Sequence, residues 1–176
     1  LDLGADIVND VRSLALPGAI EAVAAHSRAG VCLMHMQGRP QSMQAAPGYV
    51  DVVGEVRAFL AGRLAVAVDA GIGAGRIVLD PGIGFGKLPQ HNLALLARQD
   101  ELLALGRPLL VGWSRKSTLG TVTGRAVGER LASSVAAALL AAQRGASVLR
   151  VHDVAATVDA LAIWQAATPR PQDRTT

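Results

Sequence analysis

The sequence is poor in three kinds of residue that mark particular protein classes: cysteine, lysine and the aromatic residues. Its one cysteine, Cys32, excludes an internal disulfide and a cysteine-rich zinc site, and it favours a reducing compartment such as the cytoplasm. The only lysines are Lys87 and Lys116, and the arginines are scattered, so the net charge of +3 predicts no nucleic-acid partner. No apolar run reaches the roughly 18 residues of a membrane span, so no membrane partner is expected either.

What the chain does have is a pattern that occurs five times. A short apolar segment, rich in β-branched residues or leucine, ends at a polar cluster; the five segments are 4–11, 30–36, 75–80, 108–114 and 145–153. Most are too continuously apolar for strands with one solvent-exposed face, so they predict a parallel sheet covered by helices. Between them, apolar residues recur about every fourth position over 52–67, 131–142 and 155–167, which predicts the covering helices. The sequence therefore indicates an α/β protein of five βα units.

Two architectures use such repeats, an open doubly wound sheet and a closed (β/α)8 barrel. The open sheet of a nucleotide-binding protein has a glycine fingerprint, but Gly82-Ile-Gly-Phe-Gly-Lys87 fits neither that motif nor a phosphate-binding P-loop. The barrel explains more, because polar residues follow every predicted strand and barrels place their active site at that rim. We therefore predict a TIM barrel over residues 1–168, and a disordered tail over 169–176, which has two prolines and no apolar period.

Basic residues gather after the last two predicted strands. Lys116 and Ser117 follow the fourth, and Arg150 and His152 follow the fifth, two residues apart and hence on the same side of an extended strand. In barrels these two loops commonly bind phosphate. The cluster predicts a site for an oxyanion such as phosphate or pyrophosphate.

The neighbouring Arg115 and Lys116 have a second interpretation as ordinary surface ion pairs. Asp153 and Glu129 are the acidic residues that such pairs would use. Two basic clusters on adjacent loops favour the anion site over this alternative.

Two further polar residues at strand ends are candidates for ligand binding. Asp80 ends an apolar strand, where a desolvated carboxylate needs donors such as adjacent N–H groups of a ligand. Its alternative role is to cap the glycine-rich loop that follows. Asn9 is a weaker candidate, because asparagine after a strand is often a turn residue.

The segment after the second strand holds Cys32, Met34 and His35. A metal site here would need ligands that no other cysteine can supply, so we expect a buried thiol beside a histidine at the rim. Met34 is expected to line the core or the pocket, and Phe85, on the glycine-rich loop, to face an aromatic substrate. No Ser-His-Asp arrangement is evident, so covalent catalysis is not predicted.

Five motifs stand in order along the chain, namely 4–11, 32–38, 79–87, 111–117 and 149–154. Together they closely resemble the dihydropteroate synthase family, and the resemblance runs from Leu1 to about Trp164. It implies a barrel that joins 6-hydroxymethyl-7,8-dihydropterin pyrophosphate to p-aminobenzoate and releases pyrophosphate. It also implies Mg²⁺ as cofactor, with its main ligand outside this chain, and a homodimer.

The resemblance further implies roles for nine residues. Those implied as catalytic are Lys116, Arg150 and His152, and those implied as substrate-binding are Asn9, Met34, Asp80, Phe85, Gly112 and Ser117. Asn9 and Asp80 match pterin-binding positions, with Lys116, Gly112 and Met34 beside them. Arg150 and His152 match an arginine that stacks on the pterin and a histidine that binds the anion. Phe85 and Ser117 match positions near the aminobenzoate ring and carboxylate.

The length departs from the resembled family. A (β/α)8 barrel typically needs about 250 residues, and five of its eight strands are predicted here. We therefore expect a C-terminal portion of the barrel whose two unpaired sheet edges favour association.

Two other functions remain open from the sequence. A methyltetrahydrofolate methyltransferase shares the pterin-binding barrel, although it needs no pyrophosphate site, and the basic clusters at 114–117 and 150–152 argue against it. A pterin-binding protein without catalytic activity is the third hypothesis.

Overall fold

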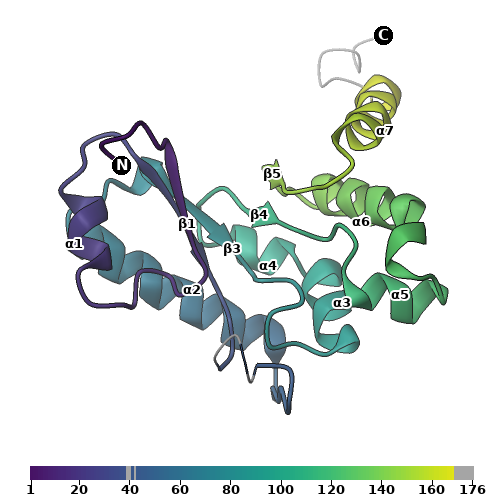
Figure 1. Ribbon diagram of the computed structural model, residues 1–176, viewed down its shortest axis with the longest axis horizontal. Coiled ribbons are helices and arrows are strands. Elements are labelled where there is room, and N and C mark those ends of the chain that lie inside the picture. Colours follow the sequence, from purple (N-terminus) through teal and green to yellow (C-terminus); the bar gives the residue numbers. More distant parts are fainter. Residues whose placement is uncertain (39–40, 42, 169–176) are drawn as a thin grey trace, which may run out of the picture.

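The computed structural model describes residues 1–38, 41 and 43–168, which form an α/β fold with parallel strands (Figure 1). The strands are β1 (Ile7–Asp10), β2 (Gly30–Met34), β3 (Ile77–Asp80), β4 (Leu110–Val111) and β5 (Val148–Leu149). The helices are α1 (Ala19–Ala24), α2 (Val52–Asp69), α3 (Pro89–Ala97), α4 (Asp100–Leu103), α5 (Ser117–Thr123), α6 (Leu131–Gln143) and α7 (Val154–Ala167). Short 3-10 turns cover Ala74–Arg76 and Val127–Glu129.

The five strands follow one another in chain order. β1, β2 and β3 form one parallel sheet, and β4 pairs in parallel with β5. A parallel bridge between Leu79 and Leu109 joins the two groups, with Leu79 N donating to Pro108 O at 3.0 Å. Each strand leads into at least one helix before the next strand begins, which is the arrangement predicted from the repeated pattern.

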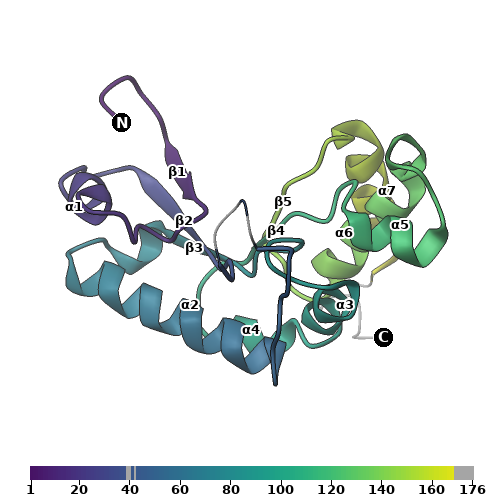
Figure 2. The ribbon, with the colours of Figure 1, turned by 60° about the horizontal axis from the view of Figure 1, so that its bottom comes forward.

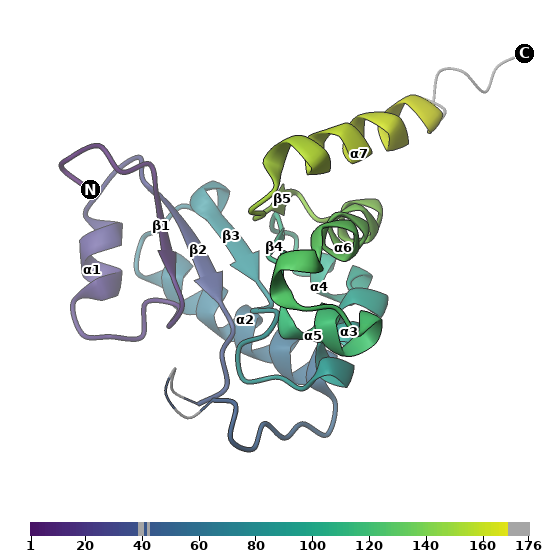
Figure 3. The same cartoon turned by 45° about the vertical axis from the view of Figure 1, so that its right-hand side comes forward.

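The strand register sorts the side chains of the sheet onto two faces. Asn9 pairs with Cys32, and Met34 pairs with Asp80, so these four residues share one face. The opposite face packs under α2, which lies across the back of β2 and β3 (Figure 3). Its core consists of fully buried residues from the strands and the helix: Val31, Leu33, Ile77, Leu79, Val53, Val56 and Leu60. The helix-covered face is thus the hydrophobic core, and the other face is free to carry polar residues.

The helix α6 matches the predicted range, but the face that it buries is lined by alanines and not by its larger apolar residues. Leu131 is 48% exposed, whereas Ala137 and Ala141 are buried in the core cluster. Alanine side chains allow a close approach of the helix to its neighbours, while Leu131 and Leu140 stay exposed and Leu139 is only partly buried. Figure 2 shows α6 and α7 at the opposite end of the molecule from α1.

The predicted α/β class and parallel pairing are confirmed. The predicted tail, 169–176, lies outside the described residues. No helix among the described residues is both long and apolar enough to cross a membrane.

Candidate functional site

The loop after β3 has a conformation that only its glycines allow. Gly82 and Gly86 have φ angles of +67° and +59°, which side chains with a Cβ rarely adopt. A Cβ added to Gly82 would lie 1.9 Å from the carbonyl oxygen of His35, and one added to Gly86 would lie 2.5 Å from that of Gln37. The loop therefore packs directly on the backbone that follows β2, and only glycine fits at these two positions.

Asp80 is the buried carboxylate of the site. Its side chain is 4% exposed, and its Oδ1 accepts a hydrogen bond from Gly82 N at 2.7 Å. Burial raises the pKa of Asp80 to about 6, against the lowering effects of that hydrogen bond and of the nearby cations Arg150, Lys87 and Lys116. Asp80 does cap the glycine-rich loop, but only with one oxygen. Within the described residues Oδ2 has no hydrogen-bond donor, so it is available to a ligand.

Lys87, which the sequence did not identify as a functional residue, is buried beneath this loop. It is 3% exposed, and its Nζ lies 2.9 Å from His35 Nδ1, 3.0 Å from Gly82 O and 3.1 Å from Phe85 O. Burial lowers the pKa of Lys87 to about 7. The buried thiol of Cys32 is confirmed, and His35 follows the end of β2 as expected, but its side chain is buried against Lys87. Its pKa falls to about 3, first through burial and then through the Lys87 charge.

Lys116 reaches across to the same loop. Its Nζ lies 4.4 Å from the centre of the Phe85 ring, in a cation–π contact. A Cβ on Gly84 would come within 3.0 Å of Lys116 Cδ, so this glycine leaves room for the lysine chain. Burial, followed by the charge of Arg150, lowers the pKa of Lys116.

Arg115 points elsewhere, although it is the neighbour of Lys116 in sequence. It is exposed and forms an ion pair with Asp153, with 2.8 Å between Nη2 and Oδ1. The surface interpretation is therefore confirmed for Arg115 and not for Lys116. Arg115 has a φ of +60°, and Arg130 Nη1 donates to its carbonyl oxygen at 3.0 Å. This turn separates the two cations.

Arg150 and His152 follow β5, as expected. The Arg150 guanidinium covers Gly112, where an added Cβ would lie 3.3 Å from Nη2, and this explains the need for a small residue there. His152 Nδ1 lies 2.9 Å from Ser114 Oγ, which also accepts from His152 N at 3.2 Å. Ser114 thus orients the histidine. The position of Ser114 at the end of a predicted strand, in the segment Gly112-Trp-Ser-Arg-Lys116, was the feature of the sequence that could have indicated this role.

The other predicted residues differ in how close they lie to this group. Met34 is buried and paired with Asp80, on the same face. Ser117 begins α5 and is exposed. Asn9 is exposed on the outer strand β1, on the Asp80 face but level with Cys32, two residues before Met34.

The described residues do not form a metal site. No three His, Cys, Asp or Glu side chains among residues 1–38, 41 and 43–168 lie together in a way that could hold a metal ion.

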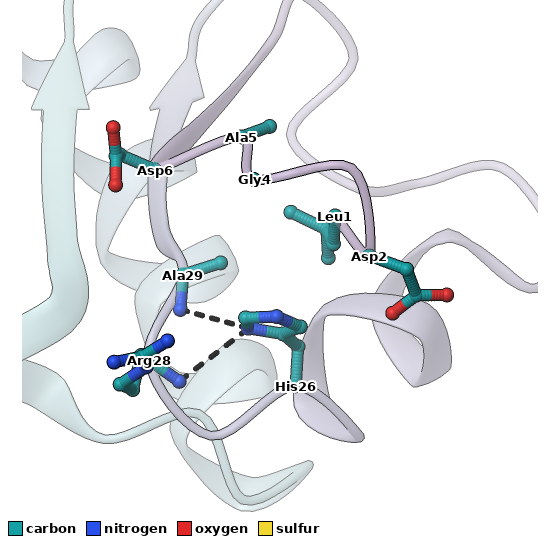
Figure 4. Close-up of a pocket in the computed structure, with 8 residues that line it drawn as sticks. All are labelled: Leu1, Asp2, Gly4, Ala5, Asp6, His26, Arg28 and Ala29. Carbon is teal, nitrogen blue, oxygen red and sulfur yellow. Dashed lines mark hydrogen bonds between the residues drawn. The ribbon is translucent and has the colours of Figure 1, made fainter.

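A pocket at the other end of the strands contains none of the predicted residues (Figure 4). It is lined by Leu1, Asp2, Gly4, Ala5, Asp6, His26, Arg28 and Ala29. His26 Nδ1 accepts from Ala29 N at 3.0 Å, which makes this histidine part of the local turn.

Comparison with known proteins shows the family and the fold to which this chain is similar. Residues 1–152 match the family described as pterin binding enzyme. Dihydropteroate synthase of Neisseria meningitidis serogroup B is 54% identical over 167 residues, which cover 93% of this chain and 59% of that protein. Dihydropteroate synthase from Stenotrophomonas maltophilia, solved with imidazole in its active site, superposes with a TM-score of 0.92 at 53% identity, covering 96% of this chain and 64% of that one.

A third relative was solved with a bound pteroate. The dihydropteroate synthase from Xanthomonas albilineans in complex with 7,8-dihydropteroate has a TM-score of 0.88 and 53% identity, over 96% of this chain and 64% of that one. The chain thus spans about 60% of the length of these relatives. The match over residues 1–152 and the shared fold show that the chain belongs to the family of pterin-binding enzymes.

Proposed function

We propose that this chain carries most of the substrate site of a dihydropteroate synthase. Such a transferase condenses 6-hydroxymethyl-7,8-dihydropterin pyrophosphate with p-aminobenzoate to give 7,8-dihydropteroate and pyrophosphate. The observation that carries the proposal is the buried Asp80 carboxylate, with one oxygen free of donors among the described residues and the cations Lys116 and Arg150 nearby. A pterin ring offers adjacent N–H donors to the carboxylate, and its pyrophosphate offers negative charge to the cations.

The pterin is proposed to lie on the polar face of β1, β2 and β3. Asp80 accepts from its ring N–H groups, and Asn9 provides a further polar group on the same face. Met34 packs against the ring, and Arg150, above Gly112, stacks on it. Lys116, close enough to Asp80 to affect its pKa, supplies a hydrogen bond and balances the negative charge of the carboxylate.

Catalysis in this proposal is electrostatic. When the bond between the pterin methylene and the pyrophosphate oxygen breaks, the bonding electrons leave with the pyrophosphate, and positive charge develops on the methylene. Asp80 stabilises the cationic pterin, while Arg150 and His152, which Ser114 orients, stabilise the leaving group. The neutral amine of p-aminobenzoate then forms the new C–N bond and loses one proton to solvent. An aryl amine is nucleophilic when neutral, so no residue is required as general base.

The p-aminobenzoate is proposed to bind between the loop after β3 and the start of α5. Phe85 contacts its ring, and Ser117, exposed at the first turn of α5, binds its carboxylate. The cation–π contact of Phe85 with Lys116 supports an aromatic site next to the proposed pterin site.

The proposal extends to features beyond the described residues. We infer a complete (β/α)8 barrel in which the five βα units are the last five, a homodimer, and a cytoplasmic location. The partly exposed apolar side chains of α6 and α7, among them Leu131, Val158 and Ile163, support association with another surface. Mg²⁺ belongs to the proposal as a cofactor whose main ligand lies outside the described residues.

Calorimetric titration with 6-hydroxymethylpterin tests the proposal on the chain itself. Asp80→Asn removes the charge that meets the ring N–H groups, so its affinity should fall about 10- to 100-fold, the value of a hydrogen bond to a charged group. Asp51→Asn is the matched control, because Asp51 is an exposed carboxylate paired with Arg98 on the surface. Equal affinities of the unaltered chain and the Asp80 variant would overturn the pterin site.

A further inference from the structure

The burial of Lys87 is energetically expensive and unexplained by the reaction proposed above. Its Nζ is surrounded by neutral acceptors: His35 Nδ1 at 2.9 Å and three backbone carbonyls between 3.0 and 3.4 Å. No ion pair within the described part of the chain involves it. A buried ammonium without a carboxylate partner costs free energy, so some other property of the site must require this lysine.

Lys87 holds the glycine-rich loop at two points. It donates to Gly82 O and Phe85 O, the first and last carbonyls of the turn that Phe85 N closes by donating to Gly82 O at 3.0 Å. Its third partner, His35, is itself fixed by an edge-on contact with Phe59 of α2, with 4.9 Å between ring centres. The loop is thus tied through Lys87 and His35 to a side chain of α2.

Other side chains hold the parts of the loop that Lys87 does not reach. Tyr49 donates to Gly86 O at 2.8 Å, and Asn92 accepts from Gly84 N at 2.9 Å. Of these three side chains, Lys87 is the one that donates a hydrogen bond to the carbonyl oxygen of Phe85. Lys87 thus holds the backbone of Phe85, the residue whose ring lies against Lys116.

The position of Asp80 does not depend on Lys87 in the same way. Its backbone is part of β3, where its carbonyl oxygen accepts from His35 N at 2.9 Å and it pairs with Met34. Lys87 reaches the Asp80 side chain only indirectly, through Gly82, whose N–H donates to Oδ1, and through its charge, which lowers the pKa of Asp80. Loss of the lysine should therefore disturb the aromatic site more than the carboxylate that meets the pterin.

From this geometry we propose that Lys87 is a positioning residue that sets the Phe85 ring for the aromatic acid. The proposal rests on the proposed function, because it takes the Phe85 side of the site as the place where p-aminobenzoate binds.

Two ligands separate the aromatic half of the site from the pterin half. Pteroic acid contains both the pterin and the aminobenzoate group, whereas 6-hydroxymethylpterin contains only the first. In calorimetric titrations, Lys87→Met should weaken pteroic acid about tenfold or more, while 6-hydroxymethylpterin changes less than about threefold. Lys87→Arg keeps the positive charge and the donors, so it should recover part of the lost affinity.

A matched control removes a basic residue with the same kind of anchoring at the other end of β3. Arg76 donates to the carbonyls of Ala29 and Val23, at 2.8 and 3.0 Å. Arg76→Met should lower the unfolding midpoint and leave the ratio of the two affinities unchanged.

A double-mutant cycle tests whether Lys87 acts through Phe85. Phe85→Ala should reproduce the selective loss of pteroic acid, and adding Lys87→Met to it should cost less than about twofold more. Amide hydrogen exchange gives a readout that needs no ligand: residues 82–87 should lose protection in Lys87→Met and keep it in Arg76→Met.

The outcomes distinguish the two proposals. Selective loss of pteroic acid, non-additivity with Phe85→Ala and loss of loop protection support the inference. Equal weakening of both ligands, full additivity, or the same selectivity in Arg76→Met overturns it and leaves the proposed function intact. If the unaltered chain binds neither ligand, the proposed function fails, and the role of Lys87 for an aromatic acid fails with it.

Discussion

The two ends of the parallel strands satisfy their polar groups in opposite ways. At the amino ends, Arg76 donates hydrogen bonds to two backbone carbonyls, and His26 accepts one from a backbone N–H of the following turn. At the carboxyl ends, Asp80 and Lys87 are almost fully buried, and neither forms an ion pair among the described residues. The amino ends are arranged for stability, whereas the carboxyl ends keep charges in a place where they cost stability.

That difference is what marks the site. Burial raises the pKa of Asp80 to about 6 and lowers the pKa of Lys87 to about 7, so it disfavours the charged form of each group. Shifts of this kind cluster at functional sites, because binding and catalysis need groups that folding alone would not select. The comparison can be broken or sharpened by substitutions at the two ends.

The largest loss of stability is expected when Gly82, in the loop after β3, is replaced. Gly82→Ala places a Cβ 1.9 Å from His35 O at a φ of +67°, and a backbone atom cannot move aside cheaply. We expect a loss of about 4 kcal/mol in the free energy of unfolding, measured by urea denaturation.

Gly75, in the turn before β3, provides the control at the amino end. Its added Cβ meets nothing within 4 Å, and its φ is not positive. Gly75→Ala should change the free energy of unfolding by less than about 1 kcal/mol in either direction. If both variants were equally stable, the close packing of the loop against the β2 backbone would be wrong.

The second effect is a gain of stability at the expense of binding. The pKa of Asp80 is raised from 3.8 to about 6, so the native state binds its proton more tightly than the unfolded state does. Stability is therefore lost as the pH rises from about 4 to about 6. Asp80→Asn should be more stable than the unaltered chain by about 2–3 kcal/mol at pH 7.5, and the difference should shrink as the pH falls towards 4.

Denaturation curves between pH 4 and 7.5 measure this effect. Asp51→Asn is the control, because Arg98 lowers the pKa of Asp51 and its ionised form is favoured in the folded state. That variant should show no gain. A less stable Asp80 variant at pH 7.5 would mean that the carboxylate contributes to folding, contrary to the comparison of the two ends.

Much of the fold and part of the site could be predicted from the sequence, because they depend on local patterns. Continuous apolar segments identified the parallel strands, and the four-residue period identified α2. Asp80 and Lys116 could be singled out because each follows an apolar strand. These features depend on the residues next to them in the chain.

The features that sequence reasoning missed depend on distant residues. His35 is buried in contact with Lys87, 52 positions later in the chain, and His152 is oriented by Ser114, 38 positions earlier. The segment 82–87 does not fit the P-loop motif, and nothing in its sequence indicated that Lys87 binds the backbone of the same loop. The face of α6 was also not predictable from its leucines, because close packing selected the alanines.

The smallest expected effect compares two adjacent cations, Arg115 and Lys116. The sequence predicted Lys116 for the anion site and gave both residues a second interpretation as surface ion pairs. The structure separates them: Arg115 is paired with Asp153 on the surface, and Lys116 is half-buried beside Phe85. In calorimetric titrations with inorganic pyrophosphate, Lys116→Met should lose about 2 kcal/mol, or roughly 30-fold in affinity, the value of one charge-assisted hydrogen bond.

Arg115→Met should leave that affinity nearly unchanged, because its guanidinium already has a carboxylate partner and exposed pairs are screened by solvent. The difference between the variants should persist at higher salt, since a half-buried charge is screened less than an exposed one. Equal losses in the two variants would show that the anion senses only the net charge of the loop. The inward position of Lys116 would then have no part in recognition, and the oxyanion site would have to be assigned to Arg150 and His152 alone.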